Sequence, residues 1–322
     1  MSHRPLRLAT VSEFAPRPAD IARASRAFGE IVACHPNIDP SAALAYFESL
    51  TGPNWALEWN LPRWLGQAYG LAKTAQADLV LVSALGLTAL RLQDDMADGD
   101  LPLSAAHHHL AQACLVGSRA ILGWLVEGDH PFWGELEATL TVWQDEQARG
   151  GFHLADRALG DTTQMAAAGA PLLLTAHAVT AIVGNNELLP AMRACLAAYL
   201  SAAVRIDQFK DWQADVAAER SNLFVDHMLE IWVSVPARHR PALVWSAIVH
   251  SRRFNEYLES IASQLAAAVQ LAGSLSCPGL AAYLDAYRRQ AMANARLIRT
   301  TSSATFASLQ SRILGPDGPI IR

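Results

Sequence analysis

The sequence has very little lysine and no cluster of positive charge. Lys73 and Lys210 are its only lysines, and arginine carries the remaining positive charge. The 25 Lys and Arg residues stand against 30 Asp and Glu residues, which gives a formal net charge of −5 at pH 7. Nucleic-acid-binding proteins usually show a basic patch. We therefore expect no nucleic acid as a partner.

Cysteine pairs and an apolar leader are also missing. Cys34, Cys114, Cys195 and Cys277 are widely separated and form no C-x-x-C motif, so neither a disulfide framework nor a zinc site is indicated. Residues 1–18 lack the apolar stretch of a secretory signal and are expected to form an irregular leader. These absences favour a cytoplasmic location.

Charge is absent from residues 162–186, a stretch long enough to raise the question of a membrane span. Gly169 and Pro171 interrupt it, and it is rich in alanine rather than in leucine and isoleucine. We expect no membrane span here, but a buried helix with a break near residues 169–171.

No segment alternates apolar and polar residues as a strand would. Most of the chain instead shows the 3.6-residue period of helices, with Asp39-Pro40 and Leu61-Pro62 as helix starts. No linker or repeat divides it, so we predict an all-α fold: one helical bundle at 19–312 and a loose tail at 313–322. The expected helices are 19–34, 40–50, 61–73, 75–98, 103–127, 131–149, 152–168, 171–185, 189–219, 240–272 and 279–312.

A first acidic cluster closes the expected helix 75–98. On a helix Asp94 and Asp98 lie about 40° apart around the axis, with Asp95 within about 100° of them. Converging carboxylates repel unless a cation lies between them, and oxygen ligands select a hard ion such as Mg²⁺. The alternative is an ordinary solvated helix end with acidic residues.

A second cluster follows at Asp207, Asp211 and Asp215, which step by four residues and share an arc of about 80°. No Lys or Arg stands at the positions that would offset this repulsion. Lys210 lies beside the ladder, where it is either a contact for phosphate oxygens or an ordinary exposed lysine. Two such clusters in one helical chain favour a site for metal and diphosphate.

These two motifs resemble those of the class I isoprenoid synthases, which include terpene cyclases, trans-prenyltransferases and squalene and phytoene synthases. DDMAD at 94–98 is similar to the DDxxD motif, and DQFKDWQADVAAER at 207–220 is similar to the second metal-binding region. The resemblance implies a helical bundle around a central active-site cavity. It also implies that six aspartates hold three Mg²⁺ ions around an isoprenoid diphosphate: Asp94, Asp95, Asp98, Asp207, Asp211 and Asp215.

Departures from the family leave the reaction open. A GGKRxRP-type segment is missing, which argues against chain elongation. Asp207, Asp211 and Asp215 stand where cyclases have Asn, Ser and Glu, and where squalene and phytoene synthases have Asn, Asp and Asp. We expect a terpene cyclase that ionises a linear allylic diphosphate, with prenyl transfer or head-to-head condensation as alternatives. A helical binding protein with a degenerate metal site is the non-enzymatic alternative, and a homodimer is left open.

Further residues are assigned by the same resemblance. Arg157, with Arg149 as competitor, Lys210 and Arg220 are expected to bind the diphosphate. Phe209 and Trp212 are expected to line the cavity, although core packing is the commoner role for any aromatic. Other candidates of that kind are Trp55, Trp59, Trp64, Tyr69, Phe152 and Tyr199.

Three further features of the sequence have ordinary structural explanations. Tyr287, Arg288, Arg289 and Arg296 are read as a solvated basic face rather than as a closing Arg-Tyr pair, whose order is reversed here. His107, His108 and His109 point about 100° apart on a helix and cannot share one ion. His153 and His177 are read as hydrogen-bonded interior groups.

Overall fold

The computed structural model describes residues 12–97, 99–148, 170–219, 222–229, 236 and 239–314. Every regular element in this part of the chain is helical, which confirms the predicted all-α class. Short 3-10 turns occur at Ser12–Phe14, Pro53–Trp55 and Asn186–Leu188. The α-helices are α1 (Pro18–Ala33), α2 (Pro40–Ser49), α3 (Ala56–Ala68), α4 (Lys73–Ala97), α5 (Ala105–Leu125), α6 (Phe132–Ala148), α8 (Ala170–Val183), α9 (Leu189–Ala217), α10 (Leu223–Met228), α11 (Arg240–His250), α12 (Arg253–Ser274) and α13 (Pro278–Leu314).

Side-chain caps explain several helix starts. The Asp39 side chain accepts from the Ser41 amide at 2.9 Å before α2, as the Asp39-Pro40 signal predicts. The Ser104 hydroxyl accepts from the His107 amide at 3.1 Å before α5. Each cap satisfies one of the amide groups that a first helical turn leaves without a partner.

Helix α3 differs from its prediction, because it begins at Ala56 and contains Pro62 in its interior. Proline has no N–H to donate to the carbonyl four residues earlier, which belongs to Glu58. The Ser83 hydroxyl of α4 donates to that carbonyl instead, at 2.7 Å. A contact from another helix therefore compensates for the proline, so the expected start at Leu61-Pro62 is wrong.

Two other predictions need correction. The expected helix 240–272 is two helices, α11 and α12, separated at Ser251, whose extended backbone ends α11 and whose hydroxyl bonds the Ala247 carbonyl at 2.7 Å. The short helix α10 was not predicted at all. The expected helix 152–168 and the tail beyond Leu314 lie outside the described residues.

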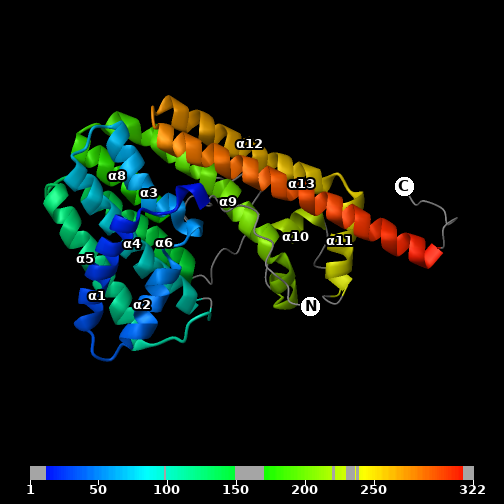
Figure 1. The fold of residues 1–322 in the computed structure, drawn as a ribbon, viewed down its shortest axis with the longest axis horizontal. Coiled ribbons are helices and arrows are strands. Elements are labelled where there is room, and N and C mark those ends of the chain that lie inside the picture. The colour runs from blue at the N-terminus through cyan, green and yellow to red at the C-terminus, as the bar shows by residue number, and fades with distance from the viewer. Residues whose placement is uncertain are drawn as a thin grey trace.

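Helices α1 to α6 and α8 lie together in one part of the molecule, and α9 leads from them toward α10 (Figure 1). Helices α12 and α13 run side by side along α9 (Figure 1). One hydrophobic core joins α3, α8, α9, α12 and α13, and another joins α1, α2, α4 and α5. Trp59 of α3 packs in the second core and donates to the Leu50 carbonyl at 2.8 Å.

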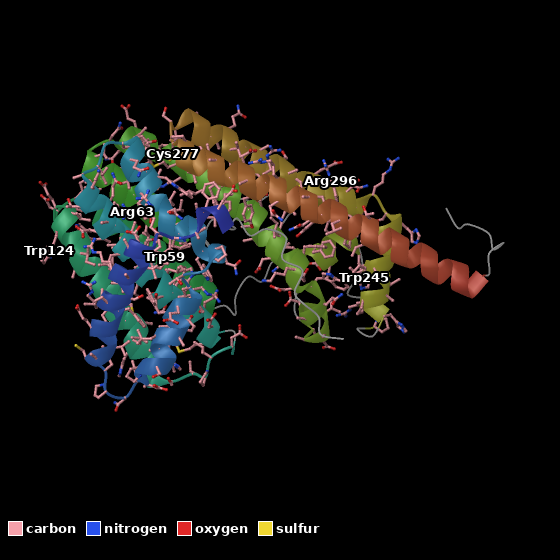
Figure 2. The ribbon with its side chains drawn as sticks, in the orientation of Figure 1. Trp59, Arg63, Trp124, Trp245, Cys277 and Arg296 are labelled. Carbon is pink, nitrogen blue, oxygen red and sulfur yellow. The ribbon has the colours of Figure 1, made fainter. Side chains whose placement is uncertain are left out.

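Some of the side chains labelled in Figure 2 connect neighbouring helices, and others point into solvent. Arg63 of α3 forms an ion pair with Asp20 of α1, in which Nε donates to Oδ2 at 2.7 Å. Trp124 of α5, at the outer edge of the molecule in Figure 2, is 91% exposed. Trp59 and Arg63 thus fix α3 against α1 and α2, whereas Trp124 takes no part in the core.

Two helical stretches have the length and composition of a membrane span. They are Lys73–Ala97 and Asn186–Ala217, and in their most apolar windows 56% and 39% of the residues are buried within the fold. A core helix of a globular protein meets the same criteria. The shorter apolar helix Leu172–Val183 lies in the stretch that was expected to be a buried helix, and Ala176 and Val179 there are fully buried.

Candidate functional site: two aspartate groups on α4 and α9

The first aspartate group lies at the end of α4, next to an internal cation. The Arg91 guanidinium forms ion pairs with both Asp94 and Asp95, one helical turn further along. It also lies over the Trp55 ring, 5.5 Å from the ring centroid. The Tyr46 hydroxyl of α2 donates to Asp95 Oδ2 at 2.8 Å. Two carboxylates of the DDMAD motif therefore already have one cation and one hydroxyl donor of the chain itself as partners.

This group is partly shielded from water. The side chains of Asp94 and Asp95 are 24% and 14% exposed. Burial and the bond to Asp95 raise the pKa of the Tyr46 hydroxyl, which holds it in the donating form. Asp98, the third predicted ligand, lies outside the described residues.

The second aspartate group lies on α9 and is more open. The Lys210 ammonium is 3.0 Å from Asp207 Oδ1 and 3.6 Å from Asp211 Oδ2. The side chains of Asp207 and Asp211 are 63% and 43% exposed. Partial burial and the charge of Asp207 raise the pKa of Asp211, although Lys210 acts in the opposite direction. One lysine therefore does not balance the negative charge of this face.

Lys210 responds to the same charges. Burial lowers the pKa of its ammonium, but the carboxylates of Asp207 and Asp211 outweigh burial and raise the pKa overall. Lys210 is thus a permanent cation beside the ladder. Its contacts show that it pairs with the aspartates, and its role with phosphate oxygens stays a prediction.

Asp215, the last residue of the ladder, contacts the start of α10. Its Oδ2 accepts from Asn222 Nδ2 at 2.7 Å, and the same nitrogen donates to the Gln208 carbonyl at 2.9 Å. Asn222 Oδ1 accepts from the amides of Phe224 and Val225 at 3.0 and 3.1 Å. Asn222 is fully enclosed, with 1% of its surface exposed. Asp215 therefore has a structural partner that sequence reasoning missed, although an asparagine before an apolar run is a known cap signal.

The aspartates do not gather into a larger metal cluster within the described residues. No group of three or more His, Cys, Asp or Glu side chains there is arranged to hold a metal ion. The structure instead presents two separate pairs, Asp94 with Asp95 and Asp207 with Asp211.

Phe209 and Trp212 of α9 are buried, and only Phe209 points away from the whole aspartate ladder, because Trp212 lies about 60° around the helix from Asp215. They stand about 200° and 140° around the helix from Asp207, and are 3% and 4% exposed. The Phe209 ring is 4.9 Å from Phe224, and the Trp212 ring is 5.7 Å from Trp245 of α11, labelled in Figure 2. This placement favours the core-packing alternative for both residues.

Some of the remaining arginine and histidine candidates lie outside the described residues, and the others have partners within the chain. Arg149, Arg157 and Arg220 lie outside the described residues, as do Phe152 and His153. Arg288 and Arg289 form ion pairs with Asp285 at 2.7 and 3.2 Å, as a basic helix face would.

His177 is buried, and its Nε2 accepts from Arg193 Nε at 2.9 Å. Burial and Arg193 lower its pKa to about 4. His177 is therefore neutral at pH 7, and its expected role as a hydrogen-bonded interior group is confirmed.

Sequence reasoning also missed a carboxyl group close to a cluster of tyrosines. Glu58 of α3 places Oε2 out of contact with water and without a hydrogen-bond partner. Tyr199 of α9 and Tyr283 and Tyr287 of α13 pack against one another, with ring centroids 5.4 to 6.3 Å apart. The charge of Glu58 raises the pKa of all three hydroxyls, in addition to the effect of burial. In the sequence, the signal for this group is an acidic residue within a largely apolar helical stretch.

Comparisons with known proteins give no relative from which a role for these residues could be transferred. No protein-family model, no curated protein and no solved structure matches the chain.

Proposed function

We propose that the chain is a Mg²⁺-dependent enzyme of the class I isoprenoid synthase type, which ionises a linear allylic isoprenoid diphosphate and releases diphosphate. The observation that carries the proposal is the pair Asp207 and Asp211 on α9. Both carboxylates are accessible to a ligand, and Lys210 only partly offsets their charge. The all-helical fold and the DDMAD motif at the end of a second long helix support the same assignment.

The donor atoms at Asp207 and Asp211 fit the proposed metal. Mg²⁺ binds through one or two carboxylates and completes its shell with water and phosphate oxygens. The raised pKa of Asp211 indicates that this face gains from an added cation. When bound, Mg²⁺ would neutralise the charge that develops on the leaving diphosphate.

The side chains around the pair have separate tasks in this proposal. Asp207 and Asp211 would hold the cation, and the Lys210 ammonium, released from them, would contact phosphate oxygens. Asp94 and Asp95 are the other carboxylate pair of the proposal, for which Arg91 already supplies one positive charge. An apolar interior excludes water while the cationic intermediate exists.

The test is incubation of the purified chain with Mg²⁺ and C10, C15 or C20 allylic diphosphates, followed by hydrocarbon analysis and measurement of released diphosphate. Products from a single allylic diphosphate support cyclisation, whereas products that require isopentenyl diphosphate support chain elongation. Asp211→Ala should lower the rate about tenfold or more, because it removes a metal ligand. Asp78→Ala is the matched control, since Asp78 forms a surface ion pair with Arg23 on another face.

A helical binding protein is the second candidate, and the Arg91 contacts favour it. A guanidinium that already pairs with Asp94 and Asp95 performs the neutralising role of a metal. Thermal denaturation with Mg²⁺ and inorganic diphosphate separates the two candidates. An enzyme of the proposed type is stabilised by the combination, and Asp94→Ala with Asp98→Ala abolishes the shift; an inert cluster gives no shift in either protein.

A further inference from the structure

Glu58 is an acidic residue that belongs to neither aspartate pair. Its Oε2 atom is buried and has no hydrogen-bond partner. Its backbone position is defined, because Pro62 leaves the Glu58 carbonyl without the usual helical donor and Ser83 of α4 supplies that bond. A buried carboxylate oxygen without a hydrogen-bond partner is costly. Such a cost needs an explanation, and a catalytic role is one that buried polar groups can have.

The tyrosines near Glu58 give this region an aromatic character. Tyr283 and Tyr287 are one turn apart on α13, and Tyr199 approaches both from α9. Tyr199 and Tyr283 are 7% and 2% exposed. Aromatic rings attract cations through their faces, so rings and a carboxylate together favour a positively charged ligand.

Tyr287 connects this region with the second aspartate pair. Besides burial, the charges of Asp207 and Glu58 both raise the pKa of its hydroxyl. The geometry agrees: Tyr287 packs against Tyr199, which lies about two helical turns before Asp207 on α9, and α13 contacts α3, the helix of Glu58. A ligand with its diphosphate at Asp207 and its hydrocarbon chain along Tyr287 would bring that chain toward Glu58.

We propose that Glu58 accepts the proton that ends the reaction, with the rings of Tyr199, Tyr283 and Tyr287 facing the cationic intermediate. This inference rests on the proposed function. The allylic C–O bond breaks, and its electron pair leaves with the diphosphate. A C–H bond beside the cationic carbon then breaks, its electron pair forms a C=C bond, and the proton passes to the Glu58 carboxylate. Glu58 later returns the proton to the released diphosphate, so the net change is elimination of diphosphate.

The chemistry of Glu58 suits this step. Burial raises the pKa of its carboxyl to about 7. A base whose pKa lies near the working pH both accepts and returns a proton. Its position among apolar and aromatic side chains also keeps water from capturing the cation first.

A binding measurement tests the inference without catalysis. The probe is a trialkylammonium ion with a ten-carbon alkenyl chain, added with Mg²⁺ and inorganic diphosphate, and its affinity is measured by isothermal titration calorimetry at pH 8. We expect Glu58→Gln to weaken binding at least tenfold. Asp226→Asn is the matched control, because Asp226 of α10 also has a buried carboxylate oxygen without a partner but lies outside the tyrosine cluster; it should bind as the unaltered chain does.

Product analysis provides the second measurement. With an allylic diphosphate, Glu58→Gln should shift the products from alkenes toward alcohols formed by capture of water. Glu58→Asp, which keeps the charge, should recover part of the alkene share and serves as the second variant if Glu58→Gln does not fold. Ammonium binding and an alkene share that are both unchanged in Glu58→Gln overturn this inference alone. A chain that releases no diphosphate from any allylic substrate refutes the proposed function instead.

Discussion

The two aspartate pairs have the same kind of carboxylates but different cations. Asp94 and Asp95 share the Arg91 guanidinium, which also lies over Trp55. Asp207 and Asp211 share a lysine whose side chain is 35% exposed. The planar guanidinium can bond two carboxylates at once and stack on an aromatic ring, whereas an ammonium is a mobile point charge. The first pair is therefore preorganised and closed, and the second is open to exchange.

Position on the helix reinforces this difference. Asp94 and Asp95 lie in the last turn of α4, where the helix dipole disfavours negative charge. Arg91 offsets that disadvantage from the preceding turn. Asp207 and Asp211 lie further from the end of α9, where this dipole effect is weaker. A fixed cation is needed more at the first pair than at the second.

The largest expected effect comes from Asn222→Ala, which disconnects the second aspartate group from α10. The change removes the cap of α10 and the hydrogen bonds that Asn222 Nδ2 donates to the Asp215 carboxylate and to the Gln208 carbonyl. We expect a loss of about 2 to 3 kcal/mol in the free energy of unfolding, measured by urea denaturation. Ser104→Ala, which removes only the cap of α5, should cost about 1 kcal/mol. Equal losses in the two variants would contradict the bridging role of Asn222.

Arg91→Met tests whether the first pair depends on its internal cation. Two partly buried carboxylates would be left without their common partner, so we expect a loss of about 1 to 2 kcal/mol in unfolding free energy. Added Mg²⁺ should recover part of this loss, because the freed carboxylates can then bind the ion. Thermal denaturation with and without Mg²⁺ measures both effects. A variant as stable as the unaltered chain would show that the arginine contacts contribute nothing.

Lys210→Met is the matched change at the second pair, and its effect should be smaller. Exposed ion pairs contribute little, so we expect a loss of about 0.5 kcal/mol in the same denaturation assay. A loss as large as that of Arg91→Met would remove the distinction between a closed pair and an open one.

The smallest effect is expected from Asp211→Asn, and its sign is opposite. Because the pKa of Asp211 is raised in the folded state, ionisation of this group opposes folding above the pKa of the unfolded chain. The amide removes that opposition, so the variant should be more stable by a few tenths of a kcal/mol at pH 7. The difference should vanish once the pH falls below the ordinary carboxyl value, where the aspartate is protonated in both states. Melting temperatures at pH 7 and pH 3 decide this.

Helix positions could be predicted from the sequence because apolar periodicity and capping residues are local signals. The starts of α2 and α5 follow Asp39 and Ser104, and every described aspartate of the two clusters falls on a helix as expected. Pro62 misled the prediction of α3, since the Ser83 hydroxyl that compensates for it comes from another helix.

Some contacts of the candidate site could be predicted from the sequence, and others could not. Arg91 stands three and four residues before Asp94 and Asp95, so its pairing could have been read from the sequence. Tyr46 is 49 residues away from Asp95, and no local signal connects them. The tyrosines near Glu58 come from two further helices, so their convergence with it depends on the packing of α3, α9 and α13.

The first turn of α13 carries a constraint on sequence variation. A side chain at Gly279 would overlap the Trp64 indole of α3, whose ring centroid lies 5.5 Å from that of Tyr283. Even alanine at position 279 would push α13 away and carry Tyr283 and Tyr287 with it. In a saturation mutagenesis library, position 279 should therefore be among the least tolerant positions, and variants that survive there should carry a smaller residue in place of Trp64.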